Sequence, residues 1–396
     1  MKRFRLAVTA LAATMLAAPT FAVDITPASS TSTRLSVTGF IQAYGTYYFN
    51  ASQGATGEIG LDDRTQPSNQ FVDTIRTSRL AFNTITPNPE LGDISTCFEF
   101  DLAAPGNVTA FRLRQAYGTW GNFTLGQTWS TWVDGDAAAD EVDWFGPIGQ
   151  ASYDTPRVPL ASYKWQLNKE NSVILAAEHN NGATNGDGTN WGSGTTPADA
   201  KYPNFVGVYQ YYDKWGHIAL RALAQNYGVY DTTAAGSGVH TNKWGSAVQL
   251  SGQLNCFGLD VERDSLVYNI YTGSGLGSYG IGAQAAVYNP DQTISLYKNT
   301  GWTVGYTHTW DQKYRSNLVL SAVNFSATSN PQATDIKSQG NIQVNTFVKL
   351  TKTAELGLEY MYETVKSVSD VVIKSDGTLS NKNTSGKFEV ELKYSF

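Results

Sequence analysis

The sequence has little of what builds disulfides, metal centres or membrane-spanning helices. Only 2 of its 396 residues are cysteine and 4 are histidine. Cys97 and Cys256 could pair in an exported chain, but the strands expected below put them on distant walls, which favours two thiols. The histidines show no ligand spacing, so we expect no metal. The longest uncharged stretch, residues 265–290, is interrupted by five glycines and does not fit a spanning helix.

The N-terminus has the three parts of a secretory signal peptide. Three basic residues precede a short apolar run over residues 6–18, and a small-residue cleavage site ends at Ala22. We therefore expect residues 1–22 to be removed on export, and residues 23–33, which have no heptad pattern, to form a short periplasmic lead. The mature chain then holds the 28 basic residues less these three, against 34 acidic ones. Its net charge of −9 disfavours nucleic acid as a partner.

The final stretch, residues 385–396, alternates between apolar and polar side chains, with Phe388, Val390, Leu392, Tyr394 and Phe396 on one face. A period of two is typical of a strand with two different faces. Four charges on the other face and a terminal Phe favour a transmembrane strand over a soluble edge strand. An unpaired edge in lipid is costly, so this strand should pair with the first one. The aromatic end also resembles the terminal strands presented to the bacterial barrel-assembly machinery, which implies that Tyr394 and Phe396 are an assembly signal.

The rest of the chain repeats this strand pattern. Sixteen strands can be assigned between residues 35 and 396, and their connections alternate strictly between long and short. In outer-membrane barrels the long loops face outside and the short turns face the periplasm. We therefore predict an all-β fold, a transmembrane antiparallel β-barrel of 16 strands over residues 34–396. Among the long connections we expect loops at 228–242 and 272–296, the second with a short helix at 283–288.

Charged side chains should line the inside of this barrel, because sixteen strands enclose an aqueous channel. In the strand predicted over residues 108–120, Phe111, Leu113 and Tyr117 are expected to face lipid, so Arg112 and Arg114 face the lumen. A charge on the lipid face would cost about 2–4 kcal/mol at the midplane. The same argument adds to the lumen Arg79, Arg221, Glu99 and Asp101. Parity does not decide the facing of Arg76 and Arg157, which lie near strand ends.

The third long connection, residues 133–153, is the candidate constriction. It contains no basic residue and carries the acidic residues Asp134, Asp136, Asp140, Glu141 and Asp143. If it folds inward, its carboxylates would face Arg79, Arg112 and Arg114 across a narrow gap, and clusters of charge at close quarters are how pores select ions. The alternative is an outward, solvated acidic loop.

Three stretches resemble the trimeric DcaP-like porins of Gram-negative bacteria. They are TSRLAF at 77–82 with Gly92-Asp93 after it, FRLRQAYG at 111–118 and GQTWST at 126–131, and a later block at 308–317 is also similar. The resemblance implies a sixteen-stranded trimeric porin that passes small, often anionic, organic solutes such as dicarboxylates. Arg79, Arg112 and Arg114 match the family's lumen arginines, and the resemblance favours the inward loop. Relatives can carry an N-terminal coiled coil, which residues 23–33 are not expected to form.

These observations predict a passive outer-membrane porin, with no cofactor and no enzymatic activity. Its expected partners are outer-membrane lipid and lipopolysaccharide, small solutes, two further copies of the chain and the barrel-assembly machinery. Two alternatives stay open. One is a general diffusion porin without solute preference, and the other is an adhesin or structural surface barrel with a plugged lumen.

Overall fold

A computed structural model describes residues 23–24, 33–49, 69–90, 92–103, 109–142, 156–180, 199–231, 238–255, 264–280, 285–289, 291–326, 335–370, 372–373 and 378–396. The predicted signal peptide, most of the periplasmic lead, Asp143 and Cys256 lie outside these residues. Cys97 carries a free thiol. Among the described residues, no helix is long and apolar enough to cross a membrane.

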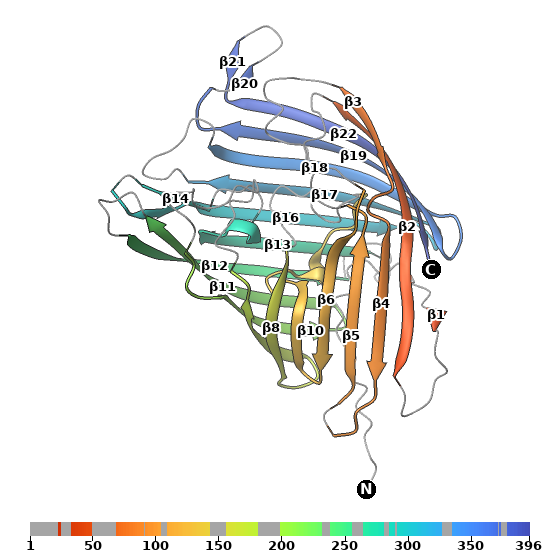
Figure 1. Cartoon of the computed structure of the whole chain (residues 1–396). Coiled ribbons are helices and arrows are strands. Elements are labelled where there is room, and N and C mark those ends of the chain that lie inside the picture. Colours follow the sequence, from red (N-terminus) through yellow and green to blue (C-terminus); the bar gives the residue numbers. More distant parts are fainter. Residues whose placement is uncertain are drawn as a thin grey trace.

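The described strands form one closed antiparallel barrel (Figure 1). Its sheet contains 18 assigned strands, one of which is the two-residue β1 (Val23–Asp24). Strands β3 (Gln70–Thr74) and β4 form one interrupted strand against β2. Without β1, and with β3 and β4 counted once, the barrel wall has sixteen strands. The other strands are β2 (Arg34–Phe49), β4 (Arg79–Thr86), β5 (Ile94–Asp101), β6 (Arg112–Trp120), β7 (Phe123–Trp129), β8 (Arg157–Gln166), β9 (Asn171–Glu178), β10 (Asn204–Asp213), β11 (Gly216–Asp231), β12 (Val239–Leu254), β13 (Ser265–Ser274), β16 (Lys298–Thr309), β17 (Tyr314–Phe325), β18 (Ile336–Lys349), β19 (Ala354–Ser367) and β22 (Lys382–Ser395). The first and last of them, β2 and β22, pair from Phe40 to Phe49, so the predicted sixteen-strand closure is confirmed.

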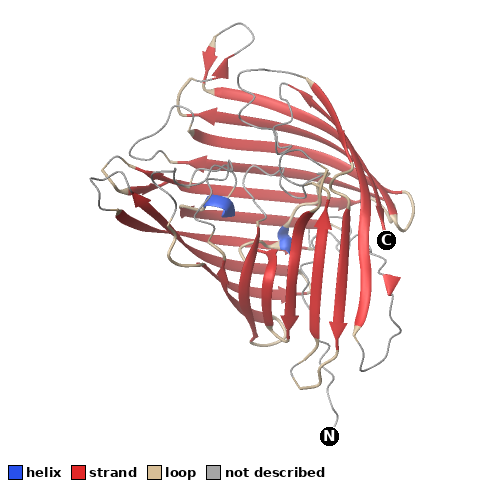
Figure 2. Ribbon diagram, viewed as in Figure 1, coloured by secondary structure: helices blue, strands red, loops and turns tan. Residues whose placement is uncertain are grey.

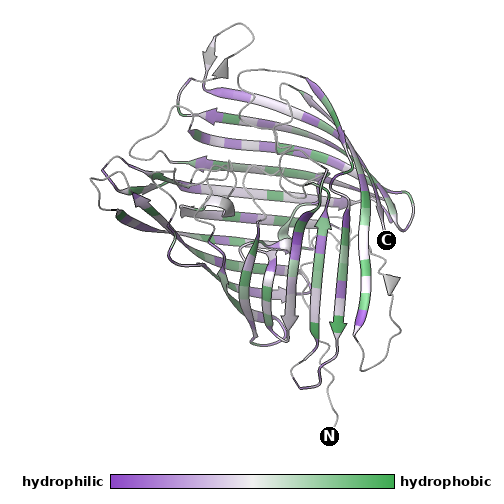
Figure 3. Cartoon of the chain, viewed as in Figure 1, coloured by the Kyte–Doolittle hydropathy of each residue, from purple (hydrophilic) through white to green (hydrophobic). Residues whose placement is uncertain are grey.

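The two faces of each strand differ, as the period of two predicted. On β11, Ile218 and Leu220 are exposed on the outside, whereas His217, Ala219 and Arg221 are buried on the inside. Figure 3 shows this alternation of apolar and polar residues along the strands. The outer surface is therefore suited to hydrocarbon and the inner surface to water.

The wall of the barrel is uneven in height. Strands β4 to β10 have only 7 to 10 residues, whereas β2, β11 and β12 have 16 each. Figure 2 shows the short strands standing in front of the long ones, with two short 3₁₀ helices, η2 (Gly135–Ala137) and η3 (Gly277–Tyr279), within the ring of strands. The low side, β4 to β8, is called the low wall below and carries most of the arginines discussed there.

A β-bulge in β6 corrects one predicted facing. Glu99 pairs with Gln115 but Phe100 pairs with Leu113, so Arg114 is the extra residue. Beyond such a bulge the inside and outside positions exchange. Tyr117 therefore stands opposite Cys97 and shares its inward face, and the prediction that Tyr117 faces lipid is wrong. Phe111 and Leu113 precede the bulge and are exposed on the outside as expected.

Two expected loops are also more regular than predicted. Instead of a helix over 283–288, residues Ala286–Tyr288 form β14, which pairs with β15 (Ile294–Leu296). Strand β11 continues to Asp231 and β12 starts at Val239, so the loop expected at 228–242 is shorter. Polar and glycine-rich composition suggested loops there, but cross-strand pairing extended the strands. Two further short strands, β20 (Val372–Ile373) and β21 (Leu379–Ser380), lie before β22.

The seam between the first and last strands depends on a glycine. Gly39 and Phe396 exchange two backbone hydrogen bonds, of 3.1 and 3.0 Å. A Cβ on Gly39 would lie 2.3 Å from the backbone oxygen of Arg79 and 3.0 Å from the Phe396 ring. Any larger residue would push β4 or the chain end away from β2. Whether Tyr394 and Phe396 act as an assembly signal stays a prediction.

We expect Gly39→Ala to lower the stability of the closed barrel by about 1–3 kcal/mol, the usual range for overpacking. Urea unfolding in lipid vesicles, followed by tryptophan fluorescence, would measure the change. Gly207→Ala is the matched control, because its Cβ would lie at an ordinary 3.5 Å from Leu175. Equal effects of the two substitutions would contradict this explanation of the seam.

Candidate functional site

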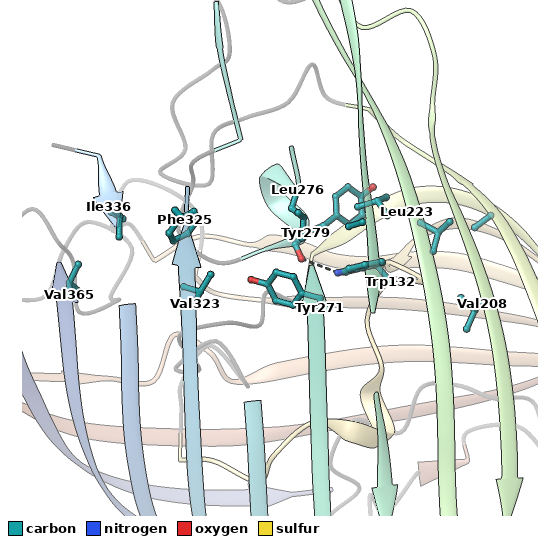
Figure 4. Packing of buried hydrophobic residues seen from close by; sticks show 13 residues of the cluster. Trp132, Val208, Leu223, Tyr271, Leu276, Tyr279, Val323, Phe325, Ile336 and Val365 are labelled. Atoms are coloured by element: carbon teal, nitrogen blue, oxygen red, sulfur yellow. Dashed lines mark hydrogen bonds between the residues drawn. The ribbon is translucent and has the colours of Figure 1, made fainter. Parts of the chain in front are cut away.

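The chain turns into the barrel directly after β7. Glu178, buried on the inner face of β9, accepts hydrogen bonds from the Ser130 hydroxyl at 2.7 Å and from the Thr131 backbone at 2.7 Å. Trp132 is completely buried and its indole donates to the backbone oxygen of Tyr279 at 3.0 Å (Figure 4). These bonds direct the following residues into the lumen.

Asp134 attaches the loop to the far wall. Arg221 Nη1 lies 2.9 Å from its carboxylate and the Ser251 hydroxyl donates to it at 2.5 Å. His217 Nε2 lies 3.1 Å from both carboxylate oxygens. Burial alone would raise the pKa of Asp134, but Arg221, His217 and Ser251 together hold that pKa below its usual range. This stabilisation is present above the unfolded pKa of about 3.9 and is lost as the pH falls through the lowered folded pKa.

The loop continues across the barrel to β17, β18 and β19. Asp140 accepts a hydrogen bond from Arg315 Nε at 2.5 Å, and its backbone oxygen accepts one from Asn345 at 2.8 Å. The Val142 backbone donates to Glu359 at 2.9 Å. The described part of the loop, 133–142, therefore lies inside the barrel, as the inward hypothesis predicted.

Apolar contacts support the same path. Ala139 packs with Val267 and Val319, and Val142 packs with Tyr44 and Phe347. A second internal segment, around Leu276 and Tyr279, joins Trp132 in the largest buried cluster (Figure 4). Sequence analysis had treated residues 275–280 only as part of a loop. Gly275 and Gly277 have φ of 66° and 54°, values that favour glycine, and so allow this segment to turn inside the barrel.

The loop carboxylates do not stand where sequence analysis expected them. Asp134 pairs with Arg221 and Asp140 pairs with Arg315, both away from the low wall. Asp136 accepts a hydrogen bond from the Tyr212 hydroxyl at 2.8 Å, and Glu141 is buried. The expectation that these groups face Arg79, Arg112 and Arg114 is therefore wrong for Asp134 and Asp140, which meet other arginines instead.

A row of four lumen side chains, one from each of four neighbouring strands, runs from β2 onto the low wall. Phe40 pairs with Arg79, Arg79 with Asp101, and Asp101 with Arg112, on β2, β4, β5 and β6. Asp101 accepts bonds from Arg112 Nε at 3.0 Å, Arg112 Nη2 at 2.6 Å and Arg114 Nη1 at 2.5 Å. Glu99 lies further off, 3.5 Å from Arg114 Nε and 3.8 Å from Arg79 Nη1.

Exposure separates these arginines into two kinds. The side chain of Arg112 is 28% exposed and that of Arg79 is 18% exposed, whereas Arg114 is only 2% exposed. A dissolved ion can therefore reach Arg79 and Arg112, while Arg114 supports Asp101 from behind. Arg221, also predicted to contact solutes, is buried against the inserted loop.

The architecture and these residues agree with a known family. The sequence model of the DcaP outer membrane protein family matches residues 12–390. This chain belongs to the DcaP outer membrane protein family. It is accordingly an outer-membrane channel rather than an enzyme, and the resemblance seen in the sequence is confirmed. Among the curated proteins, none matches.

Solved structures similar to this DcaP-family channel share its fold. The outer membrane channel DcaP of Acinetobacter baumannii is 18% identical with a TM-score of 0.76, covering 94% of this chain and 99% of that one. OmpT of Vibrio cholerae is 9% identical with a TM-score of 0.57, covering 93% and 99%. An anion-selective porin from Comamonas acidovorans is 13% identical with a TM-score of 0.57, covering 92% and 100%.

One arginine of this DcaP-family channel escaped the sequence analysis. Arg157, at the start of β8, holds its guanidinium 3.3 Å from the centre of the Trp129 ring. It interacts electrostatically with Arg114 and Arg79, and its buried Nε and Nη2 have no hydrogen-bond partner. Four arginines (79, 112, 114 and 157) thus stand against two carboxylates, Glu99 and Asp101. Its position at a strand end gave parity no basis for assigning it.

The inserted loop and β11 of the DcaP-family channel also bring together three groups with metal-like spacing. Asp134, Asp136 and His217 offer ligand atoms within 4.8 Å of one another. A cation there would have to compete with the guanidinium of Arg221, which already lies 2.9 Å from Asp134. The charge of Arg221 therefore disfavours a metal at this position.

Proposed function

We propose that this outer-membrane channel passes small anionic organic solutes in preference to neutral and cationic ones of similar size. The observation that supports this is the excess of arginine on the low wall, where Arg79, Arg112, Arg114 and Arg157 outnumber Glu99 and Asp101. Arginine stays charged at any physiological pH, so this field is permanent.

The inserted loop opposes this preference less than its acidic sequence suggests. Asp134 is paired with Arg221, and Asp140 shares Arg315 with Glu355, so part of the loop's negative charge is compensated where it stands. A carboxylate in the open part of the lumen would meet the exposed guanidinium groups of Arg79 and Arg112. Contacts with them must stay weak, because tight binding would stop conduction. The similar porin from Comamonas acidovorans is anion-selective.

We also infer that the channel works as a homotrimer joined through its low wall. A tilted strand needs about 9–11 residues to cross the hydrocarbon core, and β4, β5 and β7 have only 8, 8 and 7. Their outer face with β6 carries a cluster of aromatic rings, with centroids 5.0 to 6.2 Å apart, formed by Phe82, Phe98, Phe100 and Phe111. Neighbouring copies would shield this short apolar surface from lipid headgroups. A trimer form has been solved for the similar OmpT.

Replacing both exposed arginines tests the preference. Two charges 4 Å apart interact by about 1 kcal/mol in water, so losing each guanidinium should lower relative anion permeability about five-fold. We expect Arg79→Gln/Arg112→Gln to shift the reversal potential in a salt gradient toward cation selectivity. Planar bilayers at low salt are the appropriate measurement, because screening acts over about 8 Å at physiological ionic strength.

The control for this experiment is Lys352→Gln, which removes a positive charge from a turn outside the lumen and should leave the reversal potential unchanged. Neutral sugars of matched size should pass both variants equally. If anion and sugar permeability rise together in the double variant, the arginines only occupy space. The general diffusion porin would then be the better function.

A further inference from the structure

Barrel closure brings a lysine from the end of the chain beside the arginines of the low wall. Lys393 on β22 holds its Nζ 4.5 Å from the centre of the Phe40 ring. Arg79 holds its Cζ 5.3 Å from the same ring. Phe40 is the direct cross-strand partner of Arg79 and of Ser395. One aromatic ring on the inner wall thus lies between two cations that are 314 positions apart in the printed sequence.

Lys393 forms no ion pair within the described chain, although it interacts electrostatically with the buried Glu391 two positions away on the same face of β22. Its cross-strand neighbour on β19 is Glu355. That carboxylate is held instead by Arg315, which donates to it through both Nη1 and Nη2, the second bond at 3.0 Å. The next lysine on the same face of β22 differs, because Lys387 pairs with Glu389 at 2.6 Å and is only 6% exposed. Lys393 is partly exposed to the lumen.

Lys393 lies near a contact of the inserted loop with the wall. Its partner on β2 is Gln42. The next inward position on β2 is Tyr44, which packs against Val142 of the inserted loop. Lys393 is therefore paired with the inward position of β2 that directly precedes the loop contact at Tyr44. Arg79 lies on the other side of Phe40. An anion entering beside the loop would meet these cations in turn.

We infer that Lys393 is a third solute-contacting cation of the pore and that Phe40 is a positioning residue that holds it next to Arg79. The row Lys393, Arg79, Arg112 then gives a carboxylate a series of weak contacts along the inner wall. These three side chains line the seam between β22 and β2 and the adjoining low wall. The aromatic ring keeps the two side chains apart by cation–π contact, which leaves their donors available to the solute. This inference rests on the proposed preference for anions.

The test compares two lysines on one face of one strand. Lys393→Gln should lower the permeability ratio of acetate to potassium about five-fold in planar bilayers, the effect of one charge at about 4 Å in water. The control Lys387→Gln/Glu389→Gln removes a buried ion pair on the same face without changing the net charge, and should leave that ratio within experimental error. Heat-modifiable migration on gels checks that both variants are closed barrels. An unchanged ratio in a folded Lys393→Gln channel would overturn the inference.

Variants of Phe40 separate positioning from mere filling of space. Phe40→Tyr keeps the aromatic ring and should keep the parent's acetate-to-potassium ratio. Phe40→Leu removes the ring and should lower the ratio toward that of Lys393→Gln, and the combined Phe40→Leu/Lys393→Gln should add little. If the parent channel itself shows no anion preference, the proposed function fails. If the parent prefers anions and Phe40→Leu retains the full ratio, only the role of Phe40 fails.

Discussion

Excising the inserted loop should enlarge the pore more than any single substitution. The residues at its two ends are already neighbours, because Trp129 pairs with Arg157 and the Ser130 backbone donates to the Pro156 oxygen at 2.9 Å. A short Gly-Ser turn in place of residues 133–153 should therefore leave β7 and β8 paired. We expect single-channel conductance to rise severalfold, and neutral sugars excluded by the parent to enter in liposome-swelling assays.

The same excision should have a smaller effect on charge preference. Arg79, Arg112 and Lys393 stand on strands and remain when the loop is removed, while the widened lumen weakens their reach. A matched control removes residues 181–198, part of the long connection between β9 and β10, and should leave conductance close to that of the parent. Unchanged conductance without residues 133–153 would show that the loop does not limit the passage.

Breaking the contact between loop and far wall should be the most destabilising point change. Asp134→Ala would leave Arg221 buried without its carboxylate, and losing one partner of a buried ion pair typically costs about 3–5 kcal/mol. We expect a drop of this size in the free energy of unfolding, measured by urea titration in lipid vesicles. Unstable current at constant voltage should accompany it, because the loop loses its attachment near η2.

Replacing both partners should be much milder. Asp134→Leu/Arg221→Met removes both charges together, and apolar replacement of a buried pair is often neutral. A double variant as unstable as Asp134→Ala would mean that His217 and Ser251, not Arg221, make the decisive contacts. Leu220→Ala, on the outer face of the same strand, serves as the control for a simple loss of packing.

The sequence allowed the barrel to be predicted because the signal for it is repeated and local. Each strand shows its two faces by itself, and the last strand shows them in residues 385–396. Local pattern also sufficed to locate the connection that enters the barrel and to place Arg79 and Arg112 on the inside. The alternating pattern failed at Tyr117, because a bulge at Arg114 exchanges the two faces and no residue type there indicates a bulge.

The partners of the site residues could not be predicted, because they depend on which strands become neighbours. Asp134 and Arg221 meet only after the loop has crossed the lumen. Arg157 stands at a strand end, where alternation carries no information. Lys393 had an expected inward face, but its place beside Phe40 follows from closure between β2 and β22. Such contacts join distant parts of the chain, and the local pattern of a single sequence does not predict them.

The seam also ties selectivity to the completion of folding. Two cations of the proposed anion path, Lys393 and Arg79, come to lie on either side of Phe40 only when β22 docks on β2. A channel with an open seam would lose Lys393 from its place beside Phe40 while keeping Arg79 and Arg112, so its anion preference would be reduced. Anion preference, measured electrically, therefore reports whether β22 is paired with β2. A loss of selectivity at constant conductance would reveal seam opening in a membrane-embedded channel before any strand has unfolded.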